Sequence, residues 1–235
     1  MNVVGIFTSS LKPRQVVRQA EKICRIVTSE FPMVSSSKAR HFNSFKSDSK
    51  FGVFVENLNN RINNLFRRGK IVKTLHCKGA ENYYLDYIKT MKEKRVGNCG
   101  EGCKLAGLIG ELNGIKTYPA SLVSSPEDAH AVQILFLNDR YLTANGKFKF
   151  NGRLSNLKDA IIVDPWLGFA DTVSNALKKY KLDFPKQIGI KSSGDIFIST
   201  GCSYQPLVSE NLIKILKEKY PQFFIEKGKP LIRKK

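Results

Sequence analysis

The chain has 235 residues, of which 42% are hydrophobic and 10% aromatic, and this is enough to build one sizeable packed domain. A mostly disordered protein is therefore excluded. The formal net charge of +19 would attract acidic proteins, anionic lipid surfaces or nucleic acid at long range. Because the basic residues are spread along the chain, with neither zinc-finger spacing nor the aromatic pattern of an RNA-recognition sheet, we expect no specific nucleic-acid binding.

The five cysteines do not predict a disulfide framework, because their number is odd and their spacing irregular. We expect reduced thiols. The apolar run from Met1 to Phe7 is too short for a signal peptide, and no stretch approaches the roughly 18 apolar residues of a membrane span. These features predict a chain without a transmembrane segment that works in a reducing aqueous compartment such as the cytoplasm.

The N-terminal part of the chain is predicted to be helical. Apolar residues at helical spacing predict helices over residues 13–31, where the helix is amphipathic and basic, over residues 54–66 and over residues 84–91. Residues 35–50 are rich in Ser and Lys and predict a loop or linker. We place a boundary there, between an N-terminal basic helical region with its linker, residues 1–50, and a main domain, residues 51–235.

The main domain changes its hydrophobic period at Gly114. Before it, apolar residues from Leu105 to Leu112 recur at helical spacing, so Cys99 opens a helix. After it come short β-rich runs, separated by turn signals, over residues 115–123, 129–137, 140–149 and 160–164. A helix near residues 171–180, a strand near 188–199 and a helix over 209–220 follow. The sequence predicts an α+β domain in which the helix bearing Cys99 packs on an antiparallel sheet.

Cys99 lies in the segment Gly97-Asn98-Cys99-Gly100-Glu101, at the predicted helix N-terminus. A thiol attacks an amide carbonyl as the thiolate, which a helix N-terminus and a neighbouring imidazolium both favour. Flanking glycines let the backbone approach a substrate, and N–H groups at the helix start can donate to the oxyanion of a tetrahedral intermediate. A cysteine in such a turn is by itself weak evidence, since most cysteines are small core residues.

His130 and Asp164 give this cysteine two partners. His130 lies in an apolar strand just after a turn, and Asp164 closes the apolar run that starts at Ala160. On adjacent antiparallel strands, Asp164 would bind one ring nitrogen of the histidine while the other nitrogen faces the thiol. Alone, His130 is equally a core histidine. Together the three residues predict a relay of nucleophile (Cys99), general base (His130) and orienting carboxylate (Asp164).

The segments 97–101, 129–132 and 163–168 resemble the catalytic core of the papain-like and transglutaminase-like superfamily, with the same order Cys, His, Asp. The resemblance covers roughly residues 96–168, and its compact intervals are more similar to the transglutaminase branch. It implies a cysteine at a helix start, with histidine and aspartate on neighbouring strands. Proteases, transglutaminases, peptide N-glycanases and bacterial protein deamidases belong to this superfamily. The Lys- and Asn-rich chain also resembles secreted effectors of intracellular bacteria.

One feature departs from the papain-like pattern. These proteins place a glutamine shortly before the nucleophile to complete the oxyanion hole, whereas the glutamines before Cys99 here, Gln15 and Gln19, lie far upstream. The substitute that we predict is the N–H of Cys99 together with Asn98 or another side-chain amide, and the alternative is weak catalysis. Trp166 is predicted either to line the substrate groove or to pack over the catalytic strands.

Other candidates favour structural interpretations. Cys103 follows Cys99 by one turn, but no second ligand pair is present for a metal, so it is predicted to pack under the helix. His76 and Cys77 form an alternative dyad without an acidic partner in a strand. Glu101 is predicted to favour the helix dipole. We expect no metal and no cofactor.

These residues predict a thiol-dependent hydrolase that forms an acyl-enzyme at Cys99, either a cysteine protease or a glutamine deamidase, acting on a protein. Acyl transfer to an amine, as in a transglutaminase, is the first alternative. The second is a catalytically inactive basic module that docks on an acidic protein or a membrane. The charge favours an acidic or membrane-associated host protein as partner. The effector resemblance adds secretion into a host cell without a cleaved signal peptide to the predicted cytoplasmic location.

Overall fold

The computed structural model describes residues 13–33, 80–95, 97–125, 128–136, 140–143, 148–182, 195–199 and 208–225. The helices are α1 (Pro13–Glu30), α4 (Ala80–Lys94), α5 (Cys99–Leu112), α6 (Val173–Leu182) and α7 (Glu210–Lys219). The strands are β1 (Tyr118–Ser125), β2 (Asp128–Phe136), β3 (Asn151–Arg153), β4 (Ala160–Asp164), β5 (Phe169–Thr172) and β6 (Phe197–Ser199). Two 3₁₀ turns are η3 (Leu154–Asn156) and η4 (Pro221–Phe223).

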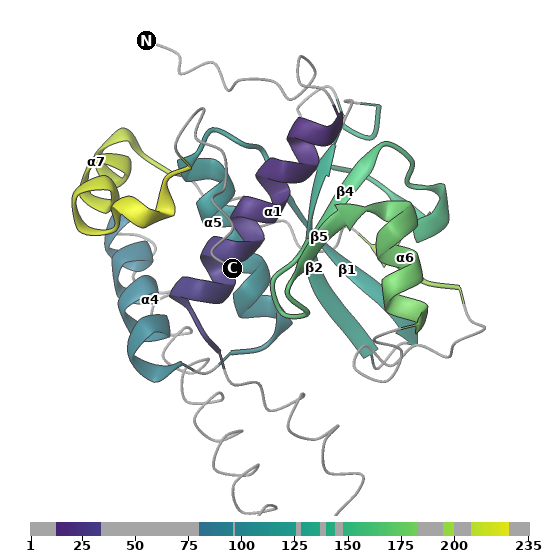
Figure 1. The fold of residues 1–235 in the computed structure, drawn as a ribbon, viewed down its shortest axis with the longest axis horizontal. Coiled ribbons are helices and arrows are strands. Elements are labelled where there is room, and N and C mark those ends of the chain that lie inside the picture. Colours follow the sequence, from purple (N-terminus) through teal and green to yellow (C-terminus); the bar gives the residue numbers. More distant parts are fainter. Residues whose placement is uncertain are drawn as a thin grey trace, which may run out of the picture.

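The six strands form one antiparallel sheet in the order β3-β6-β1-β2-β4-β5. Helices α1 and α5 lie on one side of it, with α4 and α7 beyond them, and α6 lies on the other side (Figure 1). The predicted α+β fold, with the helix that begins at Cys99 packed on an antiparallel sheet, is confirmed at this level.

The sheet separates two apolar clusters. The first joins α1, α4, α5, α7 and η4 to one face of β2 and β4, and the second joins α6 and η3 to the other face. Strand β4 is buried throughout, with Ile161 and Val163 in the first cluster and Ala160 and Ile162 in the second. Burial on both faces explains why its sequence is an unbroken apolar run rather than an alternating one.

Helix α5 lies close to the sheet because two of its four glycines, Gly107 and Gly110, face it. A Cβ on Gly110 would lie 2.6 Å from Cγ2 of Thr117 and 3.0 Å from the carbonyl oxygen of Ile115. A Cβ on Gly107 would lie 2.8 Å from Nε2 of Gln133 on β2. The amide of Gln133 in turn donates to the carbonyl of Cys103 at 2.9 Å. These contacts fix the axis of α5, and therefore the position of its first residue, against β1 and β2.

The basic amphipathic helix predicted over residues 13–31 is confirmed as α1. Its apolar stripe is buried in the first cluster, against α5, β4 and β5. Its basic side chains Arg14, Arg18 and Arg25 are exposed. The boundary predicted at residue 50 lies outside the described residues, but the N-terminal helix itself belongs to the same core as α5.

The helices predicted before Gly97 and over residues 209–220 correspond to α4 and α7. The strand predicted near residues 188–199 is described only from residue 195 and contains β6. The predicted helix over residues 54–66, the linker over residues 35–50, and His76 with Cys77 lie outside the described residues.

Two predictions in the second half of the chain are wrong in detail. The run predicted as a strand over residues 140–149 forms, within its described part, a single bridge between Leu142 and Phe148. Leu142 and Phe148 pair with each other, so the described ends of the run fold back on themselves instead of joining the sheet. The helix predicted from Asp171 starts at Val173, because Asp171 and Thr172 end strand β5.

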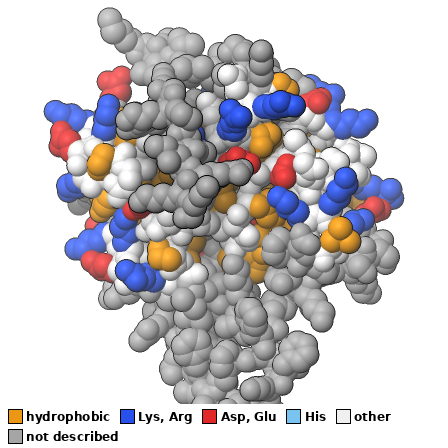
Figure 2. Space-filling model, viewed as in Figure 1, with side chains coloured by type: hydrophobic (Ala, Val, Ile, Leu, Met, Phe, Trp, Pro, Cys, Tyr) orange, Lys and Arg blue, Asp and Glu red, His pale blue; other side chains and the backbone are white. Residues whose placement is uncertain are grey.

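On one face of the molecule, the basic side chains of the described residues are not gathered into one patch. Figure 2 shows Lys and Arg side chains distributed over the visible face, with acidic side chains among them. None of the helices in the described part of the chain combines the length and apolar composition that a membrane crossing requires.

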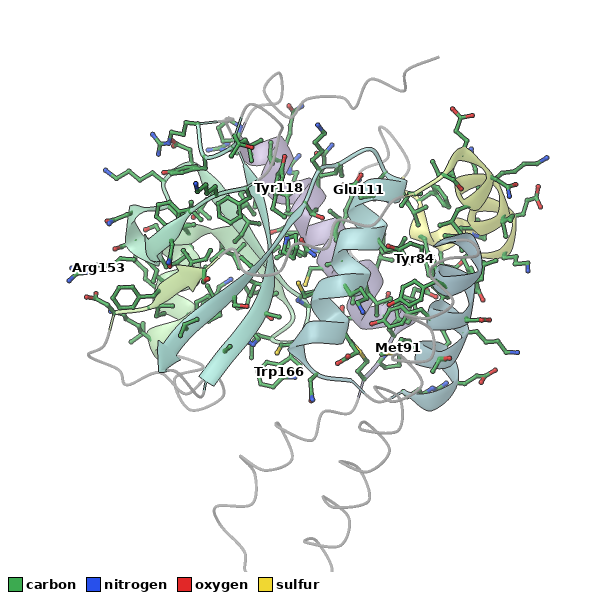
Figure 3. All side chains as sticks on the ribbon, turned by 180° about the vertical axis from the view of Figure 1, so that it is seen from behind. Tyr84, Met91, Glu111, Tyr118, Arg153 and Trp166 are labelled. Carbon is green, nitrogen blue, oxygen red and sulfur yellow. The ribbon has the colours of Figure 1, made fainter. Side chains whose placement is uncertain are left out.

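Glu111, near the C-terminal end of α5, is half-buried (Figure 3). Burial raises its pKa to about 7, against the opposing charge of Lys116. A carboxyl whose pKa is higher in the folded than in the unfolded chain destabilises the fold when it ionises. It therefore costs stability as the pH rises from the pKa of the unfolded chain through the folded pKa of about 7. We therefore expect Glu111→Gln to raise the free energy of unfolding by about 1 kcal/mol at pH 8 and to change it little at pH 4. Urea denaturation at both pH values measures this, with the exposed Glu93→Gln as the control; an equal gain at both pH values would contradict it.

Candidate active site

Cys99 is the first residue of α5 and is partly exposed. Asn98 precedes it as the N-cap, with extended backbone, and its N–H donates to the carboxylate of Glu101 at 2.9 Å. Glu101 therefore closes the start of the helix instead of only favouring its dipole. The helical pattern leaves the N–H groups of Cys99 and Gly100 without an intrahelical acceptor. The nucleophile candidate thus lies beside backbone donors that a developing oxyanion could use.

His130 and Asp164 meet at the point where β4 ends. The β2–β4 pairing starts at Gln133 opposite Val163, so His130 on β2 lies beyond the last residue of β4. Asp164 is the last residue of β4, and its side chain lies on the same face of the sheet as that of His130. Nε2 of His130 and Oδ2 of Asp164 are 2.6 Å apart, and both residues are buried, with 5% and 0% of their surface exposed. The adjacent antiparallel strands predicted for these residues are therefore present.

The Cys99 thiol lies beside the ring of His130, close enough to raise the pKa of that ring. Because Nε2 is engaged by Asp164, Nδ1 is the ring nitrogen left to face the thiol. The first turn of α5 reaches the ring past the end of β4, where a Cβ on Gly102 would lie 3.6 Å from Pro165 and from the N–H nitrogen of Trp166. The structure thus brings together Cys99, His130 and Asp164, with His130 hydrogen-bonded to Asp164 and next to the Cys99 thiol.

The electrostatics of this trio favour a protonated histidine. Burial, the largest influence, lowers the pKa of His130, but the charge and hydrogen bond of Asp164, followed by those of Cys99, outweigh it and raise the pKa to about 10. At neutral pH the ring is therefore an imidazolium.

The carboxylate of Asp164 is held from several sides. Oδ1 accepts from the N–H of Leu167 at 3.1 Å, and Oδ2 accepts from the hydroxyl of Tyr180 at 3.0 Å as well as from His130. The Cys24 thiol of α1 donates to its main-chain carbonyl at 3.9 Å. Burial and then the charge of Asp164 raise the pKa of Cys24 to about 12, so this thiol is an inert core group.

Trp166 packs against the catalytic histidine candidate. Its ring centroid lies 5.2 Å from that of His130, at an interplanar angle of 54°, and its side chain is 6% exposed. In Figure 3, Trp166 lies beside the end of α5 opposite to Glu111. This packing agrees with one of the two positions predicted for Trp166, and its role in lining a substrate groove stays a prediction.

Two further predicted roles can be compared with the geometry. Cys103 is buried under α5 and donates to the carbonyl of Val132 at 3.2 Å, as predicted for a packing residue. Asn98 directly precedes Cys99 and forms a capping box with Glu101 at the start of α5. Its role as an oxyanion donor stays a prediction.

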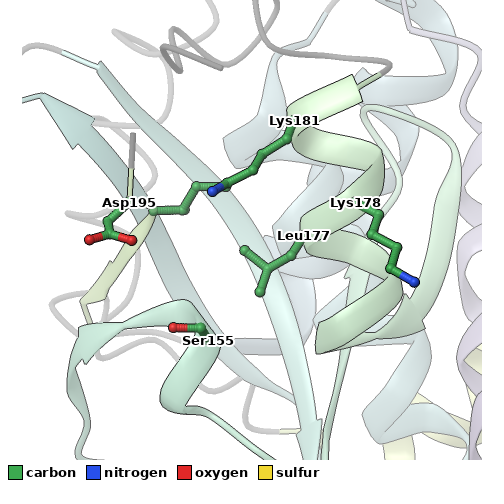
Figure 4. A pocket seen from close by; sticks show the side chains of 6 residues that line it. Ser155, Leu177, Lys178, Lys181 and Asp195 are labelled. Atoms are coloured by element: carbon green, nitrogen blue, oxygen red, sulfur yellow. The ribbon is translucent and has the colours of Figure 1, made fainter. Parts of the chain in front are cut away.

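The described residues hold no group of three or more His, Cys, Asp or Glu side chains placed to bind a metal ion. A pocket of about 160 Å³ lies on the α6 side of the sheet and is lined by Ser155, Leu177, Lys178, Lys181, Asp195 and Ile196 (Figure 4). None of Cys99, His130 and Asp164 lines it.

Sequence reasoning missed three groups around Asp164: the Tyr180 hydroxyl, the Leu167 N–H and the Cys24 thiol. The spacing of Val173, Ala176 and Tyr180 marks the buried stripe of α6, but this pattern identifies Tyr180 only as a core residue. Its hydrogen bond depends on how α6 returns under β4.

No family model, curated protein or solved structure matches the chain.

Proposed function

We propose that the chain is a thiol-dependent amide hydrolase of the papain-like or transglutaminase-like type, which forms an acyl-enzyme at Cys99 and acts on a protein substrate. The observation that carries this proposal is the buried His130 ring, hydrogen-bonded through Nε2 to Asp164 and lying beside a cysteine at a helix N-terminus. A core histidine needs neither a buried carboxylate nor a partly exposed thiol at its two nitrogens.

In the first half-reaction the Cys99 thiolate attacks the amide carbonyl carbon. A C–S bond forms while the carbonyl π electrons move to oxygen, and the N–H of Cys99 is placed to donate to that oxyanion. When the intermediate collapses, the C–N bond breaks, and the leaving nitrogen takes the proton from Nδ1 of His130. A protease releases a peptide amine at this step, and a deamidase releases ammonia.

In the second half-reaction His130, now neutral, takes a proton from water, whose oxygen attacks the thioester. The C–S bond breaks, the sulfur leaves as thiolate, and the carboxylic acid departs. Asp164 holds the ring with Nε2 protonated, so that Nδ1 faces the sulfur in both halves. If an amine replaces water, the same steps give transglutamination.

The thiol reactivity of Cys99 tests the proposal without a known substrate. We expect iodoacetamide to alkylate Cys99 at pH 7 at least about tenfold faster than a free cysteine in a peptide, because the imidazolium maintains a thiolate. His130→Ala should remove this advantage. Peptide mapping by mass spectrometry after short exposures gives the rate at each cysteine separately.

The matched control for His130→Ala is His41→Ala, which removes a histidine that the proposed mechanism does not use and should leave the Cys99 rate unchanged. Alkylation of Cys99 no faster than that of Cys202, or equal in wild type and His130→Ala, would contradict the proposal and favour the inactive basic module.

The products in a cell lysate distinguish the reactions that share this chemistry. Mass spectrometry would find new peptide termini for a protease, a gain of about one dalton on glutamine for a deamidase and amine cross-links for a transglutaminase. Each product must be absent with Cys99→Ala.

A further inference from the structure

Tyr180 occupies a position behind Asp164 that packing alone does not explain. It lies on α6, at the end of the helix, and none of its surface is exposed. Its hydroxyl donates at 3.0 Å to Oδ2 of Asp164, the same oxygen that receives Nε2 of His130 at 2.6 Å. Its ring stands edge-on to that of His130, at 75° and 6.3 Å between centroids. The tyrosine therefore contacts both members of the buried pair.

We propose that Tyr180 is a positioning residue of the Cys99–His130–Asp164 site, whose hydroxyl holds the Asp164 carboxylate on the imidazole and takes up part of its negative charge. This inference rests on the function proposed above. Together with the N–H of Leu167 on Oδ1, the hydroxyl fixes the plane of the carboxylate, since each oxygen then has a donor besides the histidine.

Sharing Oδ2 has a consequence for the proton on His130. A carboxylate oxygen that accepts from two donors attracts each of them less strongly than an oxygen with one donor. The hydroxyl thus prevents Asp164 from holding the imidazolium so tightly that it cannot give its proton to the leaving nitrogen. Catalysis needs an intermediate proton affinity of His130, because the ring must be protonated before the C–N bond breaks and must then release its proton to the leaving nitrogen.

The surrounding groups leave the hydroxyl as a permanent donor. Burial, followed by the charge and hydrogen bond of Asp164, raises the pKa of Tyr180 well above its ordinary value. The titratable groups that face it are Asp164 on β4 and the Cys24 thiol on α1, and those that face His130 are Asp164 and Cys99. Cys24 stays neutral because burial raises its pKa to about 12. Through the titration of His130, Tyr180 therefore keeps its proton.

Histidine NMR tests this inference directly, because the chain has only three histidines, His41, His76 and His130. In full-length protein labelled with ¹⁵N and ¹³C in histidine, Tyr180→Phe removes the hydroxyl and keeps the ring. We expect the titration midpoint of His130 to rise by roughly half a pH unit or more, since Asp164 then gives its charge to the imidazolium alone. Tyr180→3-fluorotyrosine keeps the hydroxyl as a stronger donor, so the midpoint should fall.

Tyr118→Phe is the matched control, since Tyr118 is a buried tyrosine of the same apolar cluster on β1. It should leave the midpoint of His130 unchanged. In an Asp164→Asn background, Tyr180→Phe should shift the midpoint much less, because the charge through which it acts is gone.

Opposite shifts for the two Tyr180 variants support the inference, and the fluorinated variant carries the test if Tyr180→Phe does not fold. An unchanged midpoint in the variants that fold, or shifts of the same sign, would overturn it. Neither result depends on turnover, so the inference can fail while Cys99 is still alkylated rapidly in a His130-dependent way, and the proposed function can fail by slow alkylation while the NMR shifts are still observed.

Discussion

Replacing Cys99 with alanine is expected to reduce amide hydrolysis to the background rate, a loss of about 10⁵-fold or more, because no other group can form the acyl-enzyme. The cost in stability should stay within about 1 kcal/mol. Cys99 is partly exposed, lies at the first position of α5, and leaves the Asn98–Glu101 bond at the helix start untouched. Product formation in the lysate assay and urea denaturation measure the two effects separately.

Cys103→Ala is the matched control for this substitution. Cys103 lies one turn along the same helix, is buried, and donates to Val132. Its loss should lower the free energy of unfolding by about 1–3 kcal/mol while the protein that remains folded keeps its turnover. Loss of Cys99 is therefore expected to abolish turnover and change stability little, whereas loss of Cys103 is expected to lower stability and leave turnover intact. Turnover that survives Cys99→Ala would refute the acyl-enzyme mechanism.

The elements that sequence predicted correctly are those whose determinants are local. Helix α1 has an apolar stripe at helical spacing after Pro13, and α5 begins at a Gly-rich turn and ends near Gly114. The apolar run of β4 is explained by burial on both faces. In each case the pattern lies within the element itself, so a single sequence contains the information.

The elements that sequence missed depend on partners far along the chain. Strands β3 and β5 have three and four residues, and they are strands because β6 and β4 lie beside them. The run at residues 140–149 has strand-forming composition, but its described ends pair with each other and not with a strand of the sheet. Local propensity cannot tell these two cases apart, because the edge available to a strand is set by the rest of the sheet.

The candidate site shows the same division. The helix start at Cys99 and the adjacent strands of His130 and Asp164 follow from local patterns and from the antiparallel order of the sheet. The donors around Asp164 do not, since Cys24 is 140 residues away from it and Tyr180 reaches it only through the return of α6. Sequence could therefore predict which three residues meet, but not what holds the carboxylate in place.

Asp164→Asn is expected to lower turnover by roughly 10³- to 10⁴-fold. The carboxylate offers two acceptor oxygens, one to the N–H of Leu167 and one shared by His130 and Tyr180. An amide has one oxygen, so in either orientation its NH₂ group faces a donor. If the NH₂ group faces Nε2, the ring must carry its proton on Nδ1, which is the wrong tautomer for contact with the sulfur. If it faces Leu167, a buried N–H loses its acceptor, at a cost of about 1–3 kcal/mol.

The same substitution should change how stability depends on pH. With Asp164 present, the pKa of His130 is raised from 6.5 to about 10, so the stabilisation it contributes is complete below pH 6.5 and is lost as the pH rises through about 10. Without the carboxylate, burial is left to lower that pKa. The free energy of unfolding of the wild type, measured by urea denaturation, should therefore exceed that of Asp164→Asn by about 3–5 kcal/mol at pH 5.5, and this difference should narrow by pH 10.

Asp171→Asn is the control. Asp171 lies on the neighbouring strand β5, and the substitution breaks its partly exposed ion pair with Lys179 of α6. It should cost about 1 kcal/mol or less, with turnover retained. A difference between wild type and Asp164→Asn that stays constant from pH 5.5 to 10 would mean that the charge of Asp164 does not act through His130, because only an imidazolium titrating across this range makes the contribution of the pair depend on pH.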